Sequence, residues 1–141
     1  MTSRREQIIS AVATALAGTA GVSGRVYRSR VEAFSRGESP AISLEPVNDV
    51  PATNVSLPKL DWSLTLRIAV IVRGAIPDQL ADPVVESVHA LVMADASLGG
   101  LSIDITPSQV NFQLIEADTP AGVVICDYAI RYRTSVESLA A

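Results

Sequence analysis

The stretch from Leu60 to Gly74 constrains the fold more than any other part of this sequence. Hydrophobic side chains occupy every second position for most of its length. They are Leu60, Trp62, Leu64, Leu66, Ile68, Val70 and Val72. A period of two residues is that of a β-strand, because a helix would scatter these side chains around its circumference. The stretch therefore predicts a long strand with one buried face and a tightly specified register.

The second face of this strand changes character along its length. It begins with Asp61, Ser63 and Thr65 and continues through Ala69 and Ile71. We expect its far, apolar half to be covered as well, either by the rest of the fold or by another subunit.

Length and composition predict one globular domain spanning residues 1–141. A chain of 141 residues can bury roughly 68–70% of the surface that its unfolded form exposes. The hydrophobic content of 48% and the charged content of 18% argue against disorder. The single cysteine, Cys126, excludes an internal disulfide and a thiolate metal site.

Charge is distributed unevenly along the chain. Residues 1–37 contain six arginines and two glutamates, a net charge of +4, whereas residues 38–141 carry a net charge of −8. This asymmetry favours head-to-tail association of identical subunits or a basic surface for a polyanion, although ordinary solvated charge also accounts for it.

The first 24 residues have some features of a signal peptide, with Arg4 and Arg5 before an uncharged run that extends to Gly24. The apolar residues Ile8, Ile9, Val12 and Leu16 fall on one helical face, however. The run is also too short and too rich in Gly, Ser and Thr for a membrane span. We therefore expect an amphipathic helix that begins at Thr2 or Ser3, ends at the following glycines and packs on a sheet, with no membrane partner.

The region between this helix and the long strand predicts two short strands and two loops. The first strand is Arg25 to Val31, with Tyr27 and Val31 facing inward and Arg28 and Arg30 facing out. A turn-rich loop at residues 34–40 precedes a strand at residues 41–44, which Pro46 closes. Residues 47–57 show no clear periodicity and predict a mobile loop or an extended arm.

The second half of the chain predicts one helix and two strands. The helix starts at Pro77 or at Pro83, with Asp82 as a possible cap, and ends at Gly99-Gly100. A strand interrupted at Pro107 runs from residue 101 to residue 114, and the last strand spans residues 123–134. In the last strand Val124, Cys126, Tyr128, Ile130 and Tyr132 share one face.

The resulting order is helix, three strands, helix, two strands. Strands joined by short turns favour antiparallel pairing. The predicted fold is therefore α+β, a mainly antiparallel sheet of about four to five strands with two helices packed on one face.

No motif predicts an active site, so we expect no enzymatic activity, no cofactor and no metal. His89 lies within the second helix among valines, and Cys126 lies on an apolar strand face without a nearby histidine. Asp78 and Asp82 are explained by capping and the helix dipole. Gly99-Gly100 follows a helix, whereas a phosphate-binding loop precedes one. The acidic chain with few aromatic residues is also a poor candidate for sequence-specific nucleic-acid binding.

Several stretches resemble the tail terminator proteins of long-tailed bacteriophages, the family of minor tail protein U and related tail-completion proteins. They include RVYRSR, SPAISLEP, ADPVVESVHALVMADASLGGLSIDI and the ending YAIRYRT, and the resemblance covers nearly the whole chain. It implies a structural virion protein that forms a hexameric ring at the head-proximal end of the tail, assembled in the host cytoplasm. The implied partners are further copies of the chain, the tail tube protein and the head-tail connector protein, with weak contact to DNA that passes through the ring.

A ring requires two different patches of one subunit to meet at each boundary. The residues that we expect to face a neighbouring subunit, the tube or DNA are Arg25, Arg28, Arg30, Arg67 and Arg73. Two rival classes remain open at this point. One is another head-tail connector or tail-tube component, and the other is a small enzyme or ligand-binding α+β domain.

Overall fold

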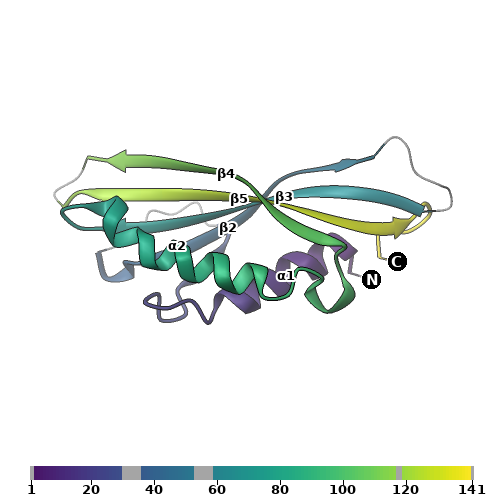
Figure 1. Cartoon of the computed structure of the whole chain (residues 1–141), viewed down its shortest axis with the longest axis horizontal. Coiled ribbons are helices and arrows are strands. Elements are labelled where there is room, and N and C mark those ends of the chain that lie inside the picture. Colours follow the sequence, from purple (N-terminus) through teal and green to yellow (C-terminus); the bar gives the residue numbers. More distant parts are fainter. Residues whose placement is uncertain (1, 30–35, 53–58, 117–118, 141) are drawn as a thin grey trace.

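A five-stranded sheet carries both helices on one of its faces (Figure 1). The computed structural model describes residues 2–29, 36–52, 59–116 and 119–140. The strands lie in the order β1-β2-β3-β5-β4, with β1 parallel to β2 and all other neighbours antiparallel. The elements are α1 (Arg4–Leu16), β1 (Val26–Arg28), β2 (Ala41–Pro51), β3 (Lys59–Arg73), α2 (Pro77–Met93), β4 (Asp104–Ile115) and β5 (Ala121–Ser135). The predicted α+β class is confirmed.

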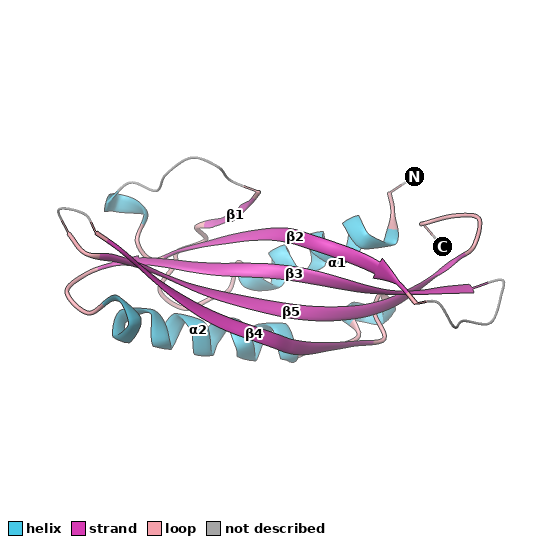
Figure 2. Ribbon diagram, turned by 90° about the horizontal axis from the view of Figure 1, so that it is seen from above, coloured by secondary structure: helices cyan, strands magenta, loops and turns pink. Residues whose placement is uncertain are grey.

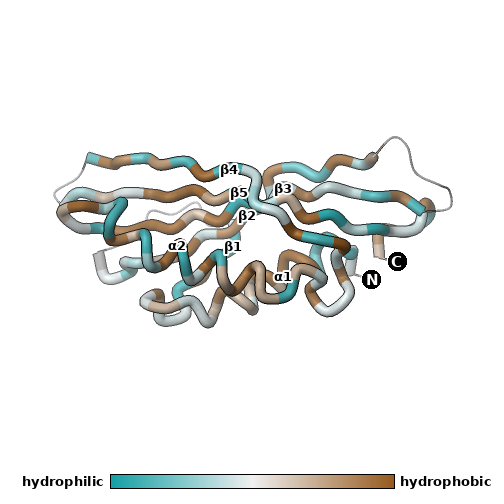
Figure 3. Tube along the Cα trace, in the orientation of Figure 1, coloured by the Kyte–Doolittle hydropathy of each residue, from teal (hydrophilic) through white to brown (hydrophobic). Residues whose placement is uncertain are grey.

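Strand β3 lies at the centre of the sheet and pairs with β5 along its whole length. Its predicted alternation is confirmed, since Leu64, Leu66, Ile68 and Val70 are fully buried beneath the helices. Leu60 and Trp62, near the start of the strand, are only partly buried. Figure 3 shows hydrophobic and hydrophilic segments alternating along the long strands.

The far half of the second face is not covered as expected. Both helices lie on the opposite face of the sheet, and Ala69 and Ile71 are half-exposed on this one (Figures 1 and 2). The alternative of coverage by another subunit remains a prediction.

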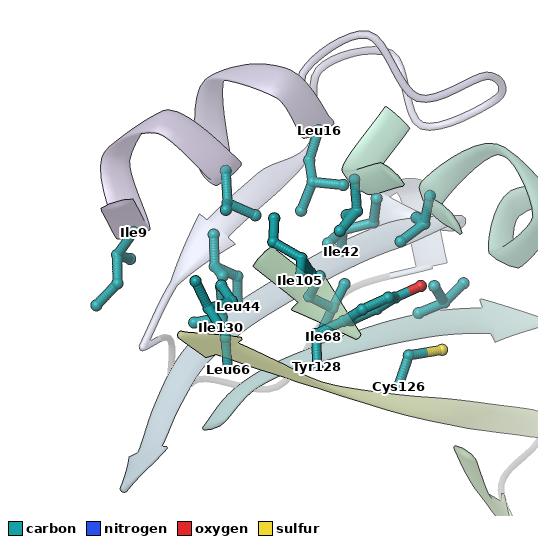
Figure 4. Packing of buried hydrophobic residues seen from close by; sticks show 14 of the residues in the cluster. Ile9, Leu16, Ile42, Leu44, Leu66, Ile68, Ile105, Cys126, Tyr128 and Ile130 are labelled. Atoms are coloured by element: carbon teal, nitrogen blue, oxygen red, sulfur yellow. The ribbon is translucent and has the colours of Figure 1, made fainter. Parts of the chain in front are cut away.

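Helix α1 begins where the sequence predicts. The Ser3 hydroxyl accepts a hydrogen bond from the Glu6 backbone N–H at 3.2 Å, which caps the first turn. Its apolar face packs on β2 and β3, and Figure 4 shows part of this core, including Leu16, Ile42 and Ile68. The helix is held by burial of this face more than by intrinsic propensity.

Helix α2 confirms one predicted boundary and corrects the other. It starts at Pro77, the first of the two predicted positions, and continues through Pro83 in its second turn. It ends at Met93, before the glycine pair. Gly99 and Gly100 instead adopt positive φ angles of 69° and 96° within a short 3₁₀ turn (Leu98–Gly100), a conformation that glycine allows at little cost.

Two other glycines allow the start of α2 to approach the sheet. A Cβ atom at Gly122 would lie 2.5 Å from the Pro77 Cβ, and one at Gly74 would lie 2.0 Å from a Leu80 methyl group. A larger residue at Gly122 would push the helix away from the strands, because the Pro77 ring is rigid, whereas at Gly74 the exposed Leu80 side chain could move aside.

Strand β2 is longer than predicted. It continues from Ala41 through Pro46 to Pro51, with a register shift between Pro46 and Asn48. The predicted loop at residues 47–57 is therefore wrong for its first five residues, and residues 53–58 lie outside the described part. A bulge tolerates proline because it relieves the requirement for a ladder N–H.

Strand β1 covers only Val26 to Arg28, and its faces are the reverse of the prediction. Val26 pairs with Ile42 and packs against the core, while Tyr27 lies on the other face and donates a hydrogen bond to Glu38 at 3.1 Å. Arg28 shares the helix side with Val26 because its long side chain reaches Glu6 on α1. Arg30 and Val31 lie outside the described residues.

Strand β4 starts at Asp104 and passes through Pro107, where the sequence predicts an interruption. Its pairing with β5 shifts register between Pro107 and Gln109, again a bulge at a proline. Strand β5 has its predicted inward set buried, including Tyr128 and Tyr132.

The two chain ends lie at the same end of the sheet (Figure 1). The Arg4 backbone N–H donates a hydrogen bond to the Leu139 carbonyl at 2.7 Å.

Candidate assembly surfaces

The five candidate arginines do not form one patch. Arg25 and Arg28 lie at the β1 edge of the sheet, and Arg67 and Arg73 lie on the face of β3 that the helices leave open. Arg30 lies outside the described residues. The structure therefore divides the predicted set between an edge and an open face.

Three arginines of the open face, Arg67, Arg131 and Arg133, are paired with aspartates directly across the strands. Arg67 on β3 binds both oxygens of Asp127 on β5, at 3.0 and 3.2 Å. Arg131 pairs with Asp104, and Arg133 pairs with Asp61, each in a register of facing residues. Such facing pairs of opposite charge are favourable in a sheet.

Ion pairing shifts the pKa of these carboxyl groups. Hydrogen bonding to Arg133 holds the pKa of Asp61 below its usual range, and Arg131 does the same for Asp104. Arg67 has its own pKa raised by Asp127. The open face thus carries charge that is largely balanced within the subunit.

Arg28 at the sheet edge is also paired. Its guanidinium donates to both Glu6 oxygens, at 2.6 and 3.0 Å, and thereby joins β1 to α1. This contact lowers the pKa of Glu6 and raises that of Arg28. The pair is exposed, so it contributes little to stability.

Arg25 and Arg73 make different contacts. The Arg25 guanidinium donates to the backbone carbonyls of Pro40, Ser39 and Gly21, which hold its position without neutralising its charge. Arg73 ends β3, and its backbone N–H donates to the Ser39 hydroxyl at 2.9 Å.

Strand β4 forms the other edge of the sheet and carries an exposed apolar row. Val110, Phe112 and Leu114 alternate along it on the helix side, yet they are 48%, 67% and 78% exposed. Helix α2 covers the neighbouring β5 and leaves this part of β4 open. The row is therefore an apolar surface on a strand with a free edge.

Acidic side chains of α2 line the space beside this row. Asp78, Asp82 and Glu86 are exposed and lie four residues apart, on one side of the helix. A groove of about 270 Å³ lies between Asp82 and Glu86 on α2 and Val110 on β4. Among the described residues, no cation pairs with any of the three carboxylates.

The groups considered for chemistry have structural contacts. The His89 Nδ1 lies 3.0 Å from the Tyr128 hydroxyl, and the two rings stack with centroids 6.1 Å apart. Cys126 is buried, and burial raises the pKa of its thiol, so the reactive thiolate is disfavoured. Within the described ranges, no group of His, Cys, Asp or Glu side chains is arranged to hold a metal ion.

The apolar row of β4 and the acidic row of α2 are features that sequence reasoning did not identify as candidate surfaces. Alternation predicts the hydrophobic side of the strand, but only the strand order shows that this strand is an edge. One available signal was the run SQVNFQLI at residues 108–115, which contains neither a charged residue nor a proline.

Similarity to known proteins is found in structure and not in sequence. No protein-family model and no curated protein matches the chain in sequence. The fold is similar to that of a chain in the virion of a native gene transfer agent particle, with a TM-score of 0.69 and 13% sequence identity. The match covers 90% of this chain and 95% of that chain. At this identity the likeness shows a shared fold over nearly the whole length of both chains.

The described part of the chain contains no helix with the length and apolar character needed to cross a membrane.

Proposed function

We propose that this chain is a structural protein of a phage-like particle, and specifically a tail terminator. In this role its copies form a ring, most simply a hexamer, at the head-proximal end of the tail. The ring caps the tail tube, ends its polymerisation and offers a surface to the head-tail connector protein. Assembly takes place in the host cytoplasm before the particle is complete.

The observation that carries this proposal is the shared fold with a chain of a gene transfer agent virion, a phage-like particle. The likeness extends over 90% of this chain and 95% of that chain, so it concerns the fold as a whole rather than a single element. The sequence resemblance to tail-completion proteins supports the narrower assignment to the terminating position. The exposed apolar edge of β4 also supports assembly, since soluble monomers seldom leave such a row uncovered.

The paired arginines favour a protein partner over DNA at the candidate sites. Arg67 and Arg28 already bind carboxylates of their own subunit, which reduces the charge available for phosphates. DNA that passes through the ring would then make only weak contacts.

Electron microscopy of tails assembled without this protein tests the proposal. A terminator predicts tubes that exceed the normal length, because nothing stops polymerisation. Tails of normal length that fail to join heads would instead assign the chain to the connector, and tails that never form a tube would assign it to the tube itself.

A further inference from the structure

We propose that the groove between α2 and the free edge of β4 receives the α1 and β1 edge of a second copy of this chain. Subunits would then associate head to tail, with one sheet following the next. This inference rests on the proposed ring, because it names the two surfaces that meet at each subunit boundary.

The two edges of the sheet are protected to different degrees. Natural edge strands are usually blunted by charges, prolines or bulges, which prevent pairing with other chains. The outer edge of β2 carries Pro46, a register shift and Pro51, and β1 covers part of it. In β4 the run at residues 108–115 has no charge and no proline, so beyond the Pro107 bulge this edge is open to a partner.

The side chains of β4 require an apolar partner surface. Phe112 and Leu114 are the two most exposed large hydrophobic residues of the described chain. They lie side by side on the helix side of the strand, where a neighbour's α1 or β1 would meet them if the sheets followed each other edge to edge.

Charge selects which surface of a second copy fits. Asp82 and Glu86 border the groove, and Asp78 lines a second hollow beside Phe112 and Leu114. None of these three carboxylates has a cationic partner among the described residues. At the opposite edge, among the described residues, Arg25 binds only backbone carbonyls and no carboxylate pairs with Arg4. The two edges lie on opposite sides of the sheet, as Figure 2 shows, so their contact is head to tail.

A two-fold contact between two β4 strands is less favourable on the same grounds. It would match the apolar rows, but it would also bring the acidic rows of two α2 helices towards each other. Like charges placed together in this way discriminate against the wrong arrangement.

Sedimentation velocity over a concentration series tests the surface on β4. Phe112→Lys should weaken self-association by about tenfold or more, because a charge replaces an apolar anchor at an interface. Gln113→Lys is the matched control, since it adds the same charge to the other, exposed face of the same strand. Equal weakening by both variants, or by neither, would overturn the proposal. Circular dichroism and the thermal midpoint establish that both variants fold.

A mixing experiment separates the head-to-tail contact from the two-fold one. Arg28→Glu leaves two carboxylates at the α1 and β1 edge, because Glu6 loses its partner, and should also weaken association. Mixed together, the Phe112→Lys and Arg28→Glu proteins each retain one good surface and should form dimers that neither forms alone. If Arg28→Glu instead dimerises by itself and mixing adds nothing, the contact is two-fold and the proposal fails.

Two results with the wild-type chain distinguish a failure of the interface from a failure of the proposed function. A wild-type chain that caps purified tail tubes while no self-association or cross-linking between copies is detected would overturn the interface and leave the terminator role intact. A wild-type chain that forms rings through β4 but does not bind tube ends would support the interface and overturn the terminator role.

Discussion

Arginine side chains in this protein act mainly within their own subunit. Arg67, Arg131 and Arg133 each bind an aspartate on the facing position of the next strand. An arginine and a carboxylate match in geometry, so each pair supports a particular register as well as adding some stability. Arg67, which the sequence suggested as a contact for an external partner, thus also joins two strands of its own sheet.

Leu66 and Thr65 allow the two faces of β3 to be tested at the level of single residues. Leu66 is fully buried beneath the helices, so Leu66→Ala should lower the free energy of unfolding by roughly 2–5 kcal/mol. Thr65→Ala, on the open face, should change it by less than about 1 kcal/mol. Urea denaturation of both variants measures the difference, and equal effects would show that the faces are assigned incorrectly.

The buried hydroxyl of Tyr128 leads us to expect a loss of stability at alkaline pH. Burial raises the pKa of its hydroxyl to about 12, above its ordinary value of 10.0, and burial also raises the pKa of Tyr132. Because the unfolded chain releases these protons first, stability should be fully present below pH 10 and fall as pH rises towards the folded pKa.

Urea midpoints measured at pH 9 and at pH 11 give the size of this loss, and absorbance of tyrosinate reports the titration itself. Tyr128→Phe should make the loss between these two pH values smaller. A loss that is unchanged in Tyr128→Phe would exclude Tyr128 as a source.

At the scale of elements, the outer half of β2 is held by one buried carboxylate. Asp49 accepts hydrogen bonds at the same oxygen from Tyr132 on β5 and, at 3.1 Å, from Arg5 on α1. Three elements that are distant in sequence therefore meet at this residue. The contact gives the strand a fixed path after its bulge at Pro46.

Asp49→Ala should loosen that half of β2 and the first turn of α1 without unfolding the sheet. Hydrogen exchange should become faster for amides at residues 47–51 and around Arg5, since both lose a buried partner. Asn48→Ala, an exposed neighbour on the other face, is the control. Exchange that accelerates equally throughout the chain would indicate global destabilisation instead.

Elements were predictable from sequence where periodicity or capping dominates. The period of two identified β3 and β5, and Ser3 marked the start of α1, because these signals are local. Strand continuation past Pro46 was not predictable, since a bulge at proline depends on the neighbouring strand. At Pro107 the alternation on both sides predicted a strand with an interruption, and the interruption is a bulge.

At the scale of the whole molecule, the proposed ring predicts a change in mass. Light scattering should detect complexes of up to six copies when tail tube ends are present, and smaller self-associated species when they are absent. A chain that stays monomeric and does not bind tubes would refute the proposed role.

The candidate surfaces were only partly predictable from sequence, because they depend on how the whole chain folds. Sequence located the arginines, but ion pairs such as Arg28 with Glu6 form between residues 22 positions apart. The exposure of Phe112 likewise depends on β4 being the last strand of the sheet, which follows from topology rather than from local pattern.

The hydrogen bond between Arg4 and Leu139 holds both ends of the chain at one end of the sheet. In the proposed ring a label fused to either terminus would therefore mark the same place on each subunit, and two labels would give one feature per subunit in an averaged image. The start of α2 lies at the far end of the sheet and would remain unlabelled (Figure 1). A single fusion protein is thus enough to determine where this end of the sheet lies relative to the head and the tube.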